Sequence, residues 1–190
     1  MNTTIVTGAS SGIGLATTVR LARNGHKVYA GVRDPDGAKQ LNEAIEASGG
    51  EIVALPLDVS DEASITSAVS RVLAECGHID VLVNNAGIAR GRSPENTPLS
   101  WVREMFETNV YGLMAMTQSV LPSMRERRTG TIVQVSSMGG RVVTPGSLYY
   151  SASKFAVEAY SEGLAGLVGM FGIRVAIVEP GFTATPIFQK

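Results

Sequence analysis

Short apolar runs alternate with longer amphipathic stretches along almost the whole chain, and this alternation constrains the fold more than any other feature. The apolar runs predict β-strands at residues 3–6, 27–32, 51–57, 79–84, 131–136 and 174–179. The stretches between them have a helical period, after Gly14 and at residues 38–47, 62–76, 101–127 and 151–170. Strands rich in Val and Ile that alternate with helices are typical of a parallel sheet buried on both faces. We therefore predict an α/β fold, with a doubly wound parallel sheet in a Rossmann-like three-layer α/β/α arrangement.

The length and composition favour one domain. A chain of 190 residues, of which 44% are hydrophobic, can bury a substantial core, and it contains no internal repeat, low-complexity segment or linker. We therefore predict a single domain over residues 1–190. Residues 88–98 contain Gly, Ser, two Pro and two Arg, which predicts a loop. Pro122 predicts a kink or an end in the helix of residues 101–127.

The charge and the cysteine content argue against several kinds of partner. A formal net charge of −1 gives no support for a nucleic acid or an anionic membrane as a partner. No run approaches the roughly 20 apolar residues that span a bilayer, and the first predicted strand leaves no room for a signal peptide. The single cysteine, Cys76, cannot form an internal disulfide, so we expect a cytoplasmic protein. His26 and His78 fall in predicted turns, and nothing near them suggests a metal site.

A glycine-rich segment, Thr7-Gly8-Ala9-Ser10-Ser11-Gly12-Ile13-Gly14, joins the first predicted strand to the first predicted helix. Gly8 would allow the tight turn, and the later glycines would let the backbone approach a pyrophosphate held by amides at the helix N-terminus. An ordinary strand–helix turn is the alternative, but the position directly after the first strand favours a dinucleotide site. A P-loop is excluded, because no Lys-Ser or Lys-Thr follows the last glycine.

Tyr150 and Lys154 lie at the start of the predicted helix of residues 151–170, and a spacing of four places both side chains on one face. A phenol has a pKa of about 10 in water, and an ammonium group beside it favours the phenolate. The pair therefore suits general acid–base catalysis on an alcohol or a carbonyl. Taken alone the pattern is weak, because any amphipathic helix can produce it by chance.

The spacing G-x-x-x-G-x-G at Gly8, preceded by Thr and combined with Y-x-x-x-K, resembles the short, single-domain type of the short-chain dehydrogenase/reductase family. Further matches follow in the family's order: Leu57-Asp58-Val59, the turn Asn84-Asn85-Ala86-Gly87, Asn109, Ser137 thirteen residues before Tyr150, and Pro180-Gly181-Phe182-Thr183-Ala184-Thr185. These matches cover nearly the whole chain, and their combination is specific.

The resemblance implies hydride transfer between a nicotinamide cofactor and a carbonyl or alcohol carbon. It implies that Tyr150 moves the proton, that Ser137 hydrogen-bonds the same oxygen and that Asn109 holds a water. It also implies that Lys154 lowers the pKa of the tyrosine and binds the nicotinamide ribose. The residues expected to bind the cofactor are Gly8, Ser10, Ser11, Gly12, Ile13, Gly14, Arg33, Asp58, Val59, Asn85, Ala86, Gly87, Tyr150, Lys154, Pro180, Gly181, Thr183 and Thr185. The alternative is a catalytically silent NAD(P)-binding sensor or interaction domain, although such relatives commonly lose the tyrosine or the lysine.

The end of the second predicted strand bears on the choice between NAD and NADP. An NAD site usually has an acidic residue there, whereas an arginine nearby accommodates the 2′-phosphate of NADP. Val32 occupies the usual position of the acid, Arg33 follows it, and Asp34 is expected to cap the next helix ahead of Pro35. NADP is therefore the predicted cofactor and NAD the less favoured one. The alternative is that Arg33 is a solvated loop residue.

The residues near the expected site are largely apolar and predict a carbonyl or alcohol substrate with a hydrophobic body: Met138, Val142, Val143, Pro145, Leu148 and Phe182. Residues 135–182 resemble the branch that includes hydroxysteroid and retinol dehydrogenases. Family members usually continue with a substrate-covering helical segment, a last helix and a seventh strand. We therefore expect that a C-terminal part is missing after Lys190, and that the full-length protein is a homo-oligomer, either a dimer or a tetramer.

Overall fold

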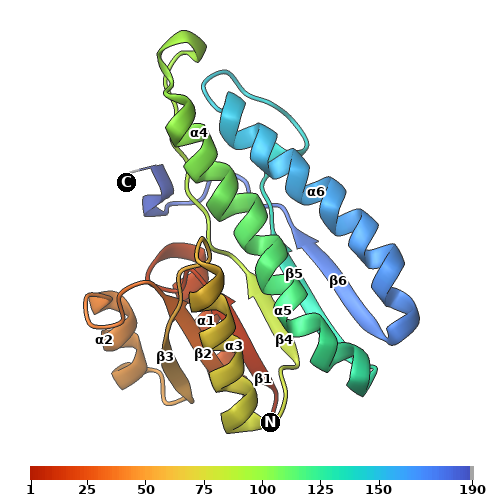
Figure 1. The fold of residues 1–190 in the computed structure, drawn as a ribbon. Helices are drawn as coiled ribbons and strands as arrows, with labels where there is room; N and C mark the ends of the chain where they lie inside the picture. The colour runs from red at the N-terminus through yellow and green to blue at the C-terminus, as the bar shows by residue number, and fades with distance from the viewer. Residues whose placement is uncertain (189–190) are drawn as a thin grey trace.

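The computed structural model describes residues 1–188, and its sheet confirms the predicted α/β fold (Figure 1). The six strands in these residues run parallel, in the order β3-β2-β1-β4-β5-β6. Their bounds lie within two residues of the predicted ones: β1 Thr3–Thr7, β2 Lys27–Val32, β3 Ile52–Pro56, β4 Val81–Asn84, β5 Gly130–Val135 and β6 Ile173–Val178.

Helices connect the strands and cover the sheet. The α-helices are α1 Gly12–Arg23, α2 Lys39–Ala47, α3 Glu62–Cys76, α4 Leu99–Phe106, α5 Gly112–Arg127 and α6 Leu148–Val168. Short 3-10 helices are η1 Pro94–Asn96, η3 Met138–Gly140, η4 Gly169–Phe171 and η5 Pro186–Phe188, and η2 Glu107–Tyr111 is a π-helix. Within the described part of the chain, no helix combines the length and the apolar character that crossing a membrane requires.

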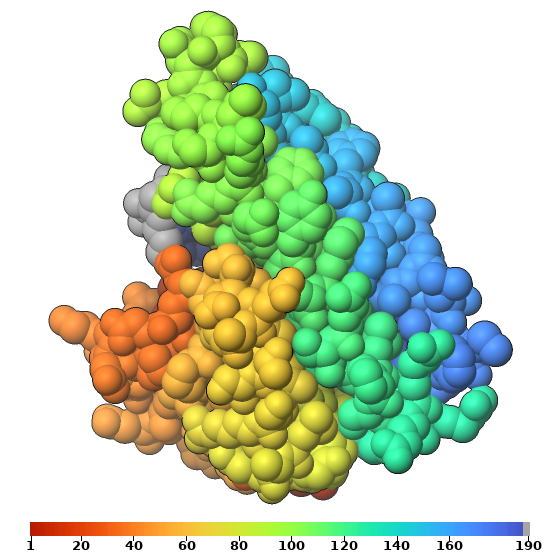
Figure 2. Space-filling model, viewed as in Figure 1, coloured from red at the N-terminus to blue at the C-terminus, as the bar shows by residue number. Residues whose placement is uncertain are grey.

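Adjacent residues of a strand face opposite sides of the sheet, and this separates two hydrophobic clusters. Ile5 and Leu82 pack on the face covered by α3, α5 and α6, against residues such as Met116. Val6 and Val83 pack on the opposite face, which α1 and α2 cover. In Figure 1 and Figure 2, α3, α5 and α6 lie side by side across the face turned to the viewer. Each fully buried aliphatic side chain contributes about 1.5–3 kcal/mol relative to an exposed one, so the two clusters hold the three layers together.

The chain changes its direction of travel across the sheet between β3 and β4. It first places β2 and β3 on one side of β1, and then returns to place β4, β5 and β6 on the other side. The carboxyl ends of β1 and β4 therefore lie next to each other where the order of strands reverses. A doubly wound sheet opens a crevice at this point, and ligands bind there.

The stretch predicted as one helix over residues 101–127 forms three segments, α4, the π-helix η2 and α5. Pro122 lies inside α5, which continues to Arg127, so the proline does not end the helix. The fully buried side chains of Val120 and Met124 hold both sides of the proline against the core. This packing offsets the backbone hydrogen bond that a proline removes.

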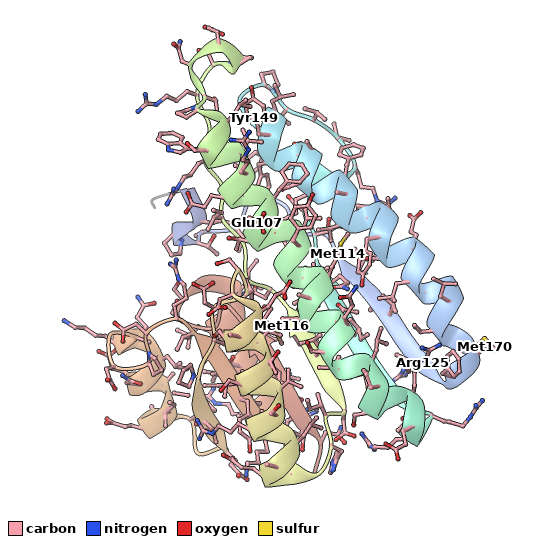
Figure 3. The ribbon with its side chains drawn as sticks, viewed as in Figure 1. Glu107, Met114, Met116, Arg125, Tyr149 and Met170 are labelled. Atoms are coloured by element: carbon pink, nitrogen blue, oxygen red, sulfur yellow. The ribbon has the colours of Figure 1, made fainter. Side chains whose placement is uncertain are left out.

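Side-chain contacts tie the two ends of α6 to its neighbours. Near its C-terminal end, the guanidinium of Arg125 on α5 lies 4.1 Å from the centre of the Phe171 ring, and Figure 3 shows Arg125 beside Met170. At its N-terminal end, the Tyr149 hydroxyl donates to the carbonyl of Pro94 at 3.2 Å. A cation above an aromatic face is attracted to it, so this contact joins α5 to η4, the short helix that directly follows α6.

A buried amide links the sheet to α5 beneath the crevice. Asn84, the last residue of β4, is 3% exposed, and its Nδ2 donates to Gln134 Oε1 and to Thr117 Oγ1, both at 3.0 Å. Gln134 is fully buried in the neighbouring strand β5. Because buried polar groups need partners, Asn84 fixes β4, β5 and α5 relative to one another.

We expect Asn84→Ala to lower the free energy of unfolding by about 1–3 kcal/mol, because Gln134 Oε1 loses its donor in a buried site. Chemical denaturation of the two proteins measures this difference. Asn96→Ala, which removes an exposed asparagine from η1, is the matched control and should change stability by less than about 0.5 kcal/mol. Equal stabilities of Asn84→Ala and the wild type would contradict this account.

Candidate functional site

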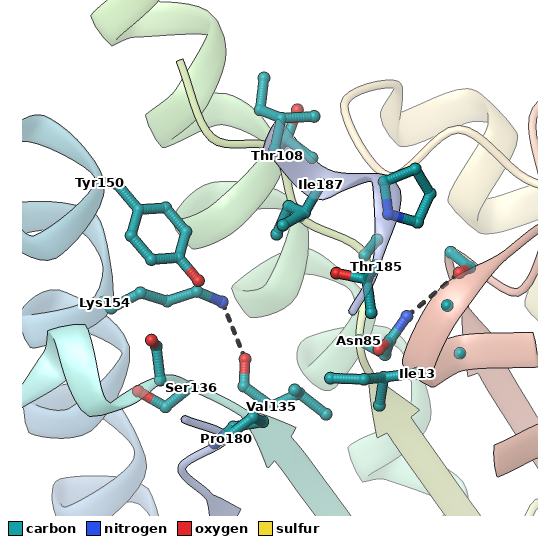
Figure 4. Close-up of a pocket in the computed structure, with 18 of the residues that line it drawn as sticks. Ile13, Asn85, Thr108, Val135, Ser136, Tyr150, Lys154, Pro180, Thr185 and Ile187 are labelled. Atoms are coloured by element: carbon teal, nitrogen blue, oxygen red, sulfur yellow. Dashed lines mark hydrogen bonds between the residues drawn. The ribbon is translucent and has the colours of Figure 1, made fainter. Parts of the chain in front are cut away.

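A pocket of about 840 Å³ lies in the crevice at the carboxyl edge of the sheet (Figure 4). It is bordered by the turns after β1 and β4, the ends of β2 and β3, the start of α6 and the segments after β5 and β6. All of the residues predicted to bind the cofactor line this pocket, and so does Ser137. Asn109 is the predicted site residue that does not line it. Within residues 1–188, no group of three His, Cys, Asp or Glu side chains could hold a metal ion.

Three glycines form one wall of the pocket. Gly8 has a φ of +67° and Gly12 a φ of +58°, in the left-handed region that glycine adopts at low cost. A Cβ atom at Gly8 would lie 2.7 Å from the Cα of Ala86, and one at Gly14 would collide with the carbonyl of Gly8. Glycine therefore lets the turn after β1 and the turn after β4 approach closely, and it leaves the backbone uncovered at these three positions of the wall.

The N-terminus of α1 forms part of this glycine wall, and its first backbone N–H groups have no partner within the helix. Its first turn contains no acidic residue, and the Ser11 side chain makes no capping hydrogen bond within the described residues. Asn85 holds the turn after β4 in place, because its Nδ2 donates to the carbonyl of Thr7 at 2.9 Å and to that of Gly8 at 3.1 Å. Figure 4 shows the bond to Gly8. Backbone N–H groups and the positive end of the helix dipole attract phosphates. The wall therefore fits the diphosphate of a dinucleotide.

The residues after β2 form one end of the pocket. Arg33 lines it and is exposed. The prediction that Asp34 caps the next helix is wrong, because α2 begins only at Lys39. Asp34 Oδ1 instead accepts a hydrogen bond from the N–H of Gly37 at 3.1 Å and closes a turn. Arg33 is thus the charged side chain after β2 that faces the pocket.

Asp58 follows β3 and lines the same pocket. Burial alone would raise the pKa of Asp58, but hydrogen bonds from Ser60 and the charge of Arg33 outweigh burial and hold the pKa below its usual value. The Ser60 N–H and hydroxyl donate to Asp58 Oδ1 at 2.9 and 2.6 Å. This end of the pocket therefore carries charges of both signs.

Tyr150 and Lys154 lie on the wall of the pocket formed by α6, across from the glycines (Figure 4). The Lys154 ammonium lies 5.8 Å from the centre of the Tyr150 ring, and it donates to the carbonyl of Val135 at 2.8 Å. Lys154 is 4% exposed, and this burial lowers the pKa of its ammonium to about 8, although the charge of Glu158 opposes the shift. The spacing of four thus places both groups on one wall.

The pKa of Tyr150 moves in the direction opposite to the expected one. Burial of the hydroxyl raises the pKa, and a hydrogen bond with the Ser137 side chain opposes this shift without reversing it. Loss of hydration is thus the largest effect on this pKa, and the role of Lys154 in lowering it stays a prediction. A phenol with a raised pKa is protonated at neutral pH and can donate a proton.

Asn109 lies beside the pocket in the π-helix η2 and is fully buried. Its Oδ1 accepts from the N–H of Ile88 at 2.8 Å, and its Nδ2 donates to the carbonyl of Ile88 at 2.9 Å and to Ser153 Oγ at 3.1 Å. The amide thus holds the segment after β4 against α6, and its role in holding a water stays a prediction. Sequence reasoning missed Ser153, although its position three residues after Tyr150 could have indicated it.

Comparison with known proteins relates nearly the whole chain to one family. Residues 2–190 match the family model described as short chain dehydrogenase. The 3-ketodihydrosphingosine reductase of Bacteroides thetaiotaomicron is 42% identical over 177 residues, which cover 93% of this chain and 62% of that protein. Estradiol 17-beta-dehydrogenase 1 of Rattus norvegicus is 39% identical over 192 residues, which cover 98% of this chain and 55% of that protein. A solved short-chain dehydrogenase from Streptomyces avermitilis is 41% identical, with a TM-score of 0.91, over 98% of this chain and 68% of that one.

The chain thus spans only part of the length of these curated relatives, 62% of the first and 55% of the second. The similarity to the rat enzyme agrees with the resemblance of residues 135–182 to the hydroxysteroid dehydrogenase branch. Because the family model matches residues 2–190 and the fold is shared with a solved member, this chain belongs to the short-chain dehydrogenase family.

Proposed function

We propose that this protein is an oxidoreductase that uses NADP to interconvert a carbonyl and an alcohol on a largely apolar small molecule. The observation that supports this best is the pocket itself, in which a glycine wall at α1 lies across from Tyr150 and Lys154. When bound, the nicotinamide cofactor would supply or accept the hydride. The chain's own residues would bind the substrate oxygen and move one proton.

Tyr150 would be the proton donor during reduction. A phenol holds its proton at neutral pH and could give it to a carbonyl oxygen. Burial raises the pKa of Tyr150 and so opposes this transfer, which would therefore depend on groups that stabilise the phenolate. Ser137 hydrogen-bonds with this side chain and would bind the same oxygen. Lys154 would stabilise the phenolate that forms, because its ammonium lies on the same wall and is buried, so that water screens its charge little.

The mouth of the pocket supports an apolar substrate. Met138, Val142 and Phe182 line the pocket, yet they are 55%, 62% and 96% exposed. Large apolar side chains that gather at an exposed place mark binding surfaces. The relatives named for estradiol and for 3-ketodihydrosphingosine agree with this choice. A hydrophobic ketone, or the matching alcohol, is therefore the proposed substrate class.

Arg33 supports NADP rather than NAD. It lines the pocket directly after Val32, which is the residue at the position where an NAD site usually has an acid. The neighbouring Asp34 is engaged with the N–H of Gly37 in a turn. A guanidinium can donate two hydrogen bonds to a phosphate, so this end of the pocket favours the 2′-phosphate of NADP.

Tyr150→Phe removes the hydroxyl and keeps the ring, so we expect the reduction of hydrophobic ketones by NADPH to fall at least about 100-fold. Binding of NADPH, measured by fluorescence titration, should stay within about twofold of the wild type. Tyr149→Phe is the matched control, since its hydroxyl contacts the carbonyl of Pro94, and should leave turnover unchanged. Turnover by Tyr150→Phe near the wild-type rate would refute the role in proton transfer.

Arg33→Ala should weaken NADPH binding by about 10–100-fold, because a charge-assisted contact to the 2′-phosphate is lost. Binding of NADH should change by less than about threefold, since NADH has no such phosphate. Titration of both cofactors measures the two losses, and Arg23→Ala, at the end of α1, is the control. Equal losses for NADPH and NADH would reject the assignment.

The pH dependence of kcat/KM reports groups of the free enzyme. Since the pKa of Lys154 is about 8, its charge is present below that pH and lost above it, so ketone reduction should decline above about pH 8. Tyr150 does not cause this decline, because its own pKa is raised. Lys154→Arg keeps a cation up to about pH 10 and beyond, so its lower rate should show no decline near pH 8. The same decline in the wild type and in Lys154→Arg would show that deprotonation of Lys154 does not cause it.

A further inference from the structure

One arginine beside the site contacts three carboxylates. Nη2 of Arg141 lies 3.3 Å from Glu158 Oε2 and 3.0 Å from Glu179 Oε1, and Nη1 lies 3.3 Å from Glu162 Oε1. The Nε of Arg141 also donates to Glu179 Oε1 at 3.0 Å. A planar guanidinium holds several oxygens in fixed directions, which an ammonium does not. These four residues are called the Arg141 cluster below.

The members of the Arg141 cluster belong to three segments that also carry site residues. Arg141 directly follows η3, whose N-cap residue is Ser137. Glu158 lies one helical turn after Lys154 on α6. Glu179 directly follows β6 and begins the segment that lines the far side of the pocket. One guanidinium therefore connects the segments after β5 and β6 with α6.

Backbone contacts already join two of these segments. The N–H of Ser136 donates to the carbonyl of Val178 at 2.8 Å, and the N–H of Met138 donates to that of Pro180 at 3.0 Å. The Arg141 cluster also connects α6 to the segments after β5 and β6, since Glu158 and Glu162 belong to that helix. These ion pairs thus add to the contact between Lys154 and the carbonyl of Val135, which also holds α6 against the end of β5.

The two carboxylates of α6 differ in burial. The side chain of Glu158 is 5% exposed, whereas that of Glu162 is 62% exposed. Exposed ion pairs contribute little to stability, but a buried carboxylate that loses its cation is costly. Neither oxygen of Glu158 has a hydrogen-bond donor among the described residues. Two cations offset its burial, Arg141 through the ion pair and Lys154 through its charge one helical turn away. A Cβ at Gly140 would lie 3.0 Å from Glu158 Cγ, so this glycine lets η3 pack tightly over the carboxylate.

We propose that Arg141 is a positioning residue, which keeps Ser137 and the Tyr150–Lys154 pair aligned by holding η3, α6 and the segment after β6 together. Glu158 is its buried anchor on α6. Arg141 does not itself line the pocket, so it acts through these segments. The inference rests on the proposed function, because it treats Ser137, Tyr150 and Lys154 as the reacting groups.

Steady-state kinetics with NADPH and a hydrophobic ketone tests this role. Arg141→Ala should lower kcat by about 10–100-fold and leave KM and the NADPH Kd within about threefold, because a small misalignment affects rate more than binding. Arg141→Lys should recover little of the rate, since an ammonium cannot hold three carboxylates in fixed directions. A wild-type kcat in both variants, or an equally large loss of NADPH affinity, would overturn the proposal.

Glu158 and Glu162 provide a matched pair on one helix. Glu158→Gln should lower kcat by about 10-fold, because it removes the charge of the buried anchor and keeps its shape. Glu162→Gln should change kcat by less than about twofold, because its ion pair is exposed. Equal effects of the two substitutions would contradict the assignment of Glu158 as the anchor.

Hydrogen exchange tests the same inference without any turnover. The amide of Met138, which donates to Pro180, should exchange at least about 10-fold faster in Arg141→Lys than in the wild type, because the segment opens more often. The amide of Ile5 in β1 should not change. If the wild type reduced no ketone, the proposed function would fail, and exchange would still decide whether Arg141 joins the segments. Unchanged exchange at Met138 would overturn the inference and leave the proposed function standing.

Discussion

The close approach of two turns is the constraint on which the rest of this structure depends. Because Gly8 and Gly14 have no side chains, the turn after β1 meets the turn after β4 with no Cβ atom between them. Asn85 then fastens the two turns through the carbonyls of Thr7 and Gly8. The strand order only creates a crevice here, as in any doubly wound sheet. The absence of side chains at the glycines leaves backbone amides uncovered on this side of the crevice.

The two walls of the pocket come from opposite ends of the chain, and a short run after β4 reaches from one to the other. At its start, Asn85 is bonded to the glycine wall. At its end, the backbone of Ile88 makes two hydrogen bonds with the side chain of Asn109. Asn109 also donates a hydrogen bond to Ser153 on α6. Residues 85–88 therefore set the distance between the proposed phosphate site and the proposed proton donor. The Arg141 cluster supports the second wall from behind, where the segments after β5 and β6 meet α6.

The parts of the structure that the sequence predicts are those that local periodicity and short motifs determine. The strands and the helix α3 follow from alternating apolar runs, and the glycine turn follows from its position after β1. The parts that it does not predict depend on distances between remote residues. Pro122 remains inside a helix because Val120 and Met124 are buried against the core, and the pKa of Tyr150 rises because its hydroxyl loses hydration. The ion pairs of Arg141 likewise join residues that no local pattern relates.

The π-helix η2 has a consequence for how the whole segment from α4 to α5 is oriented. A π turn holds one residue more than an α turn, so every residue after it is rotated by about 100° around the axis relative to an unbroken α-helix. Met105 before η2 and Met116 after it are both fully buried. An unbroken α-helix would place these two residues about 20° apart on one face, so the π turn rotates two buried positions away from each other. The extra residue in η2 thus changes the angle, around the helix axis, between the side chains of α4 and those of α5. Each of the two helices can therefore turn its apolar stripe toward a different neighbour, with no intervening loop.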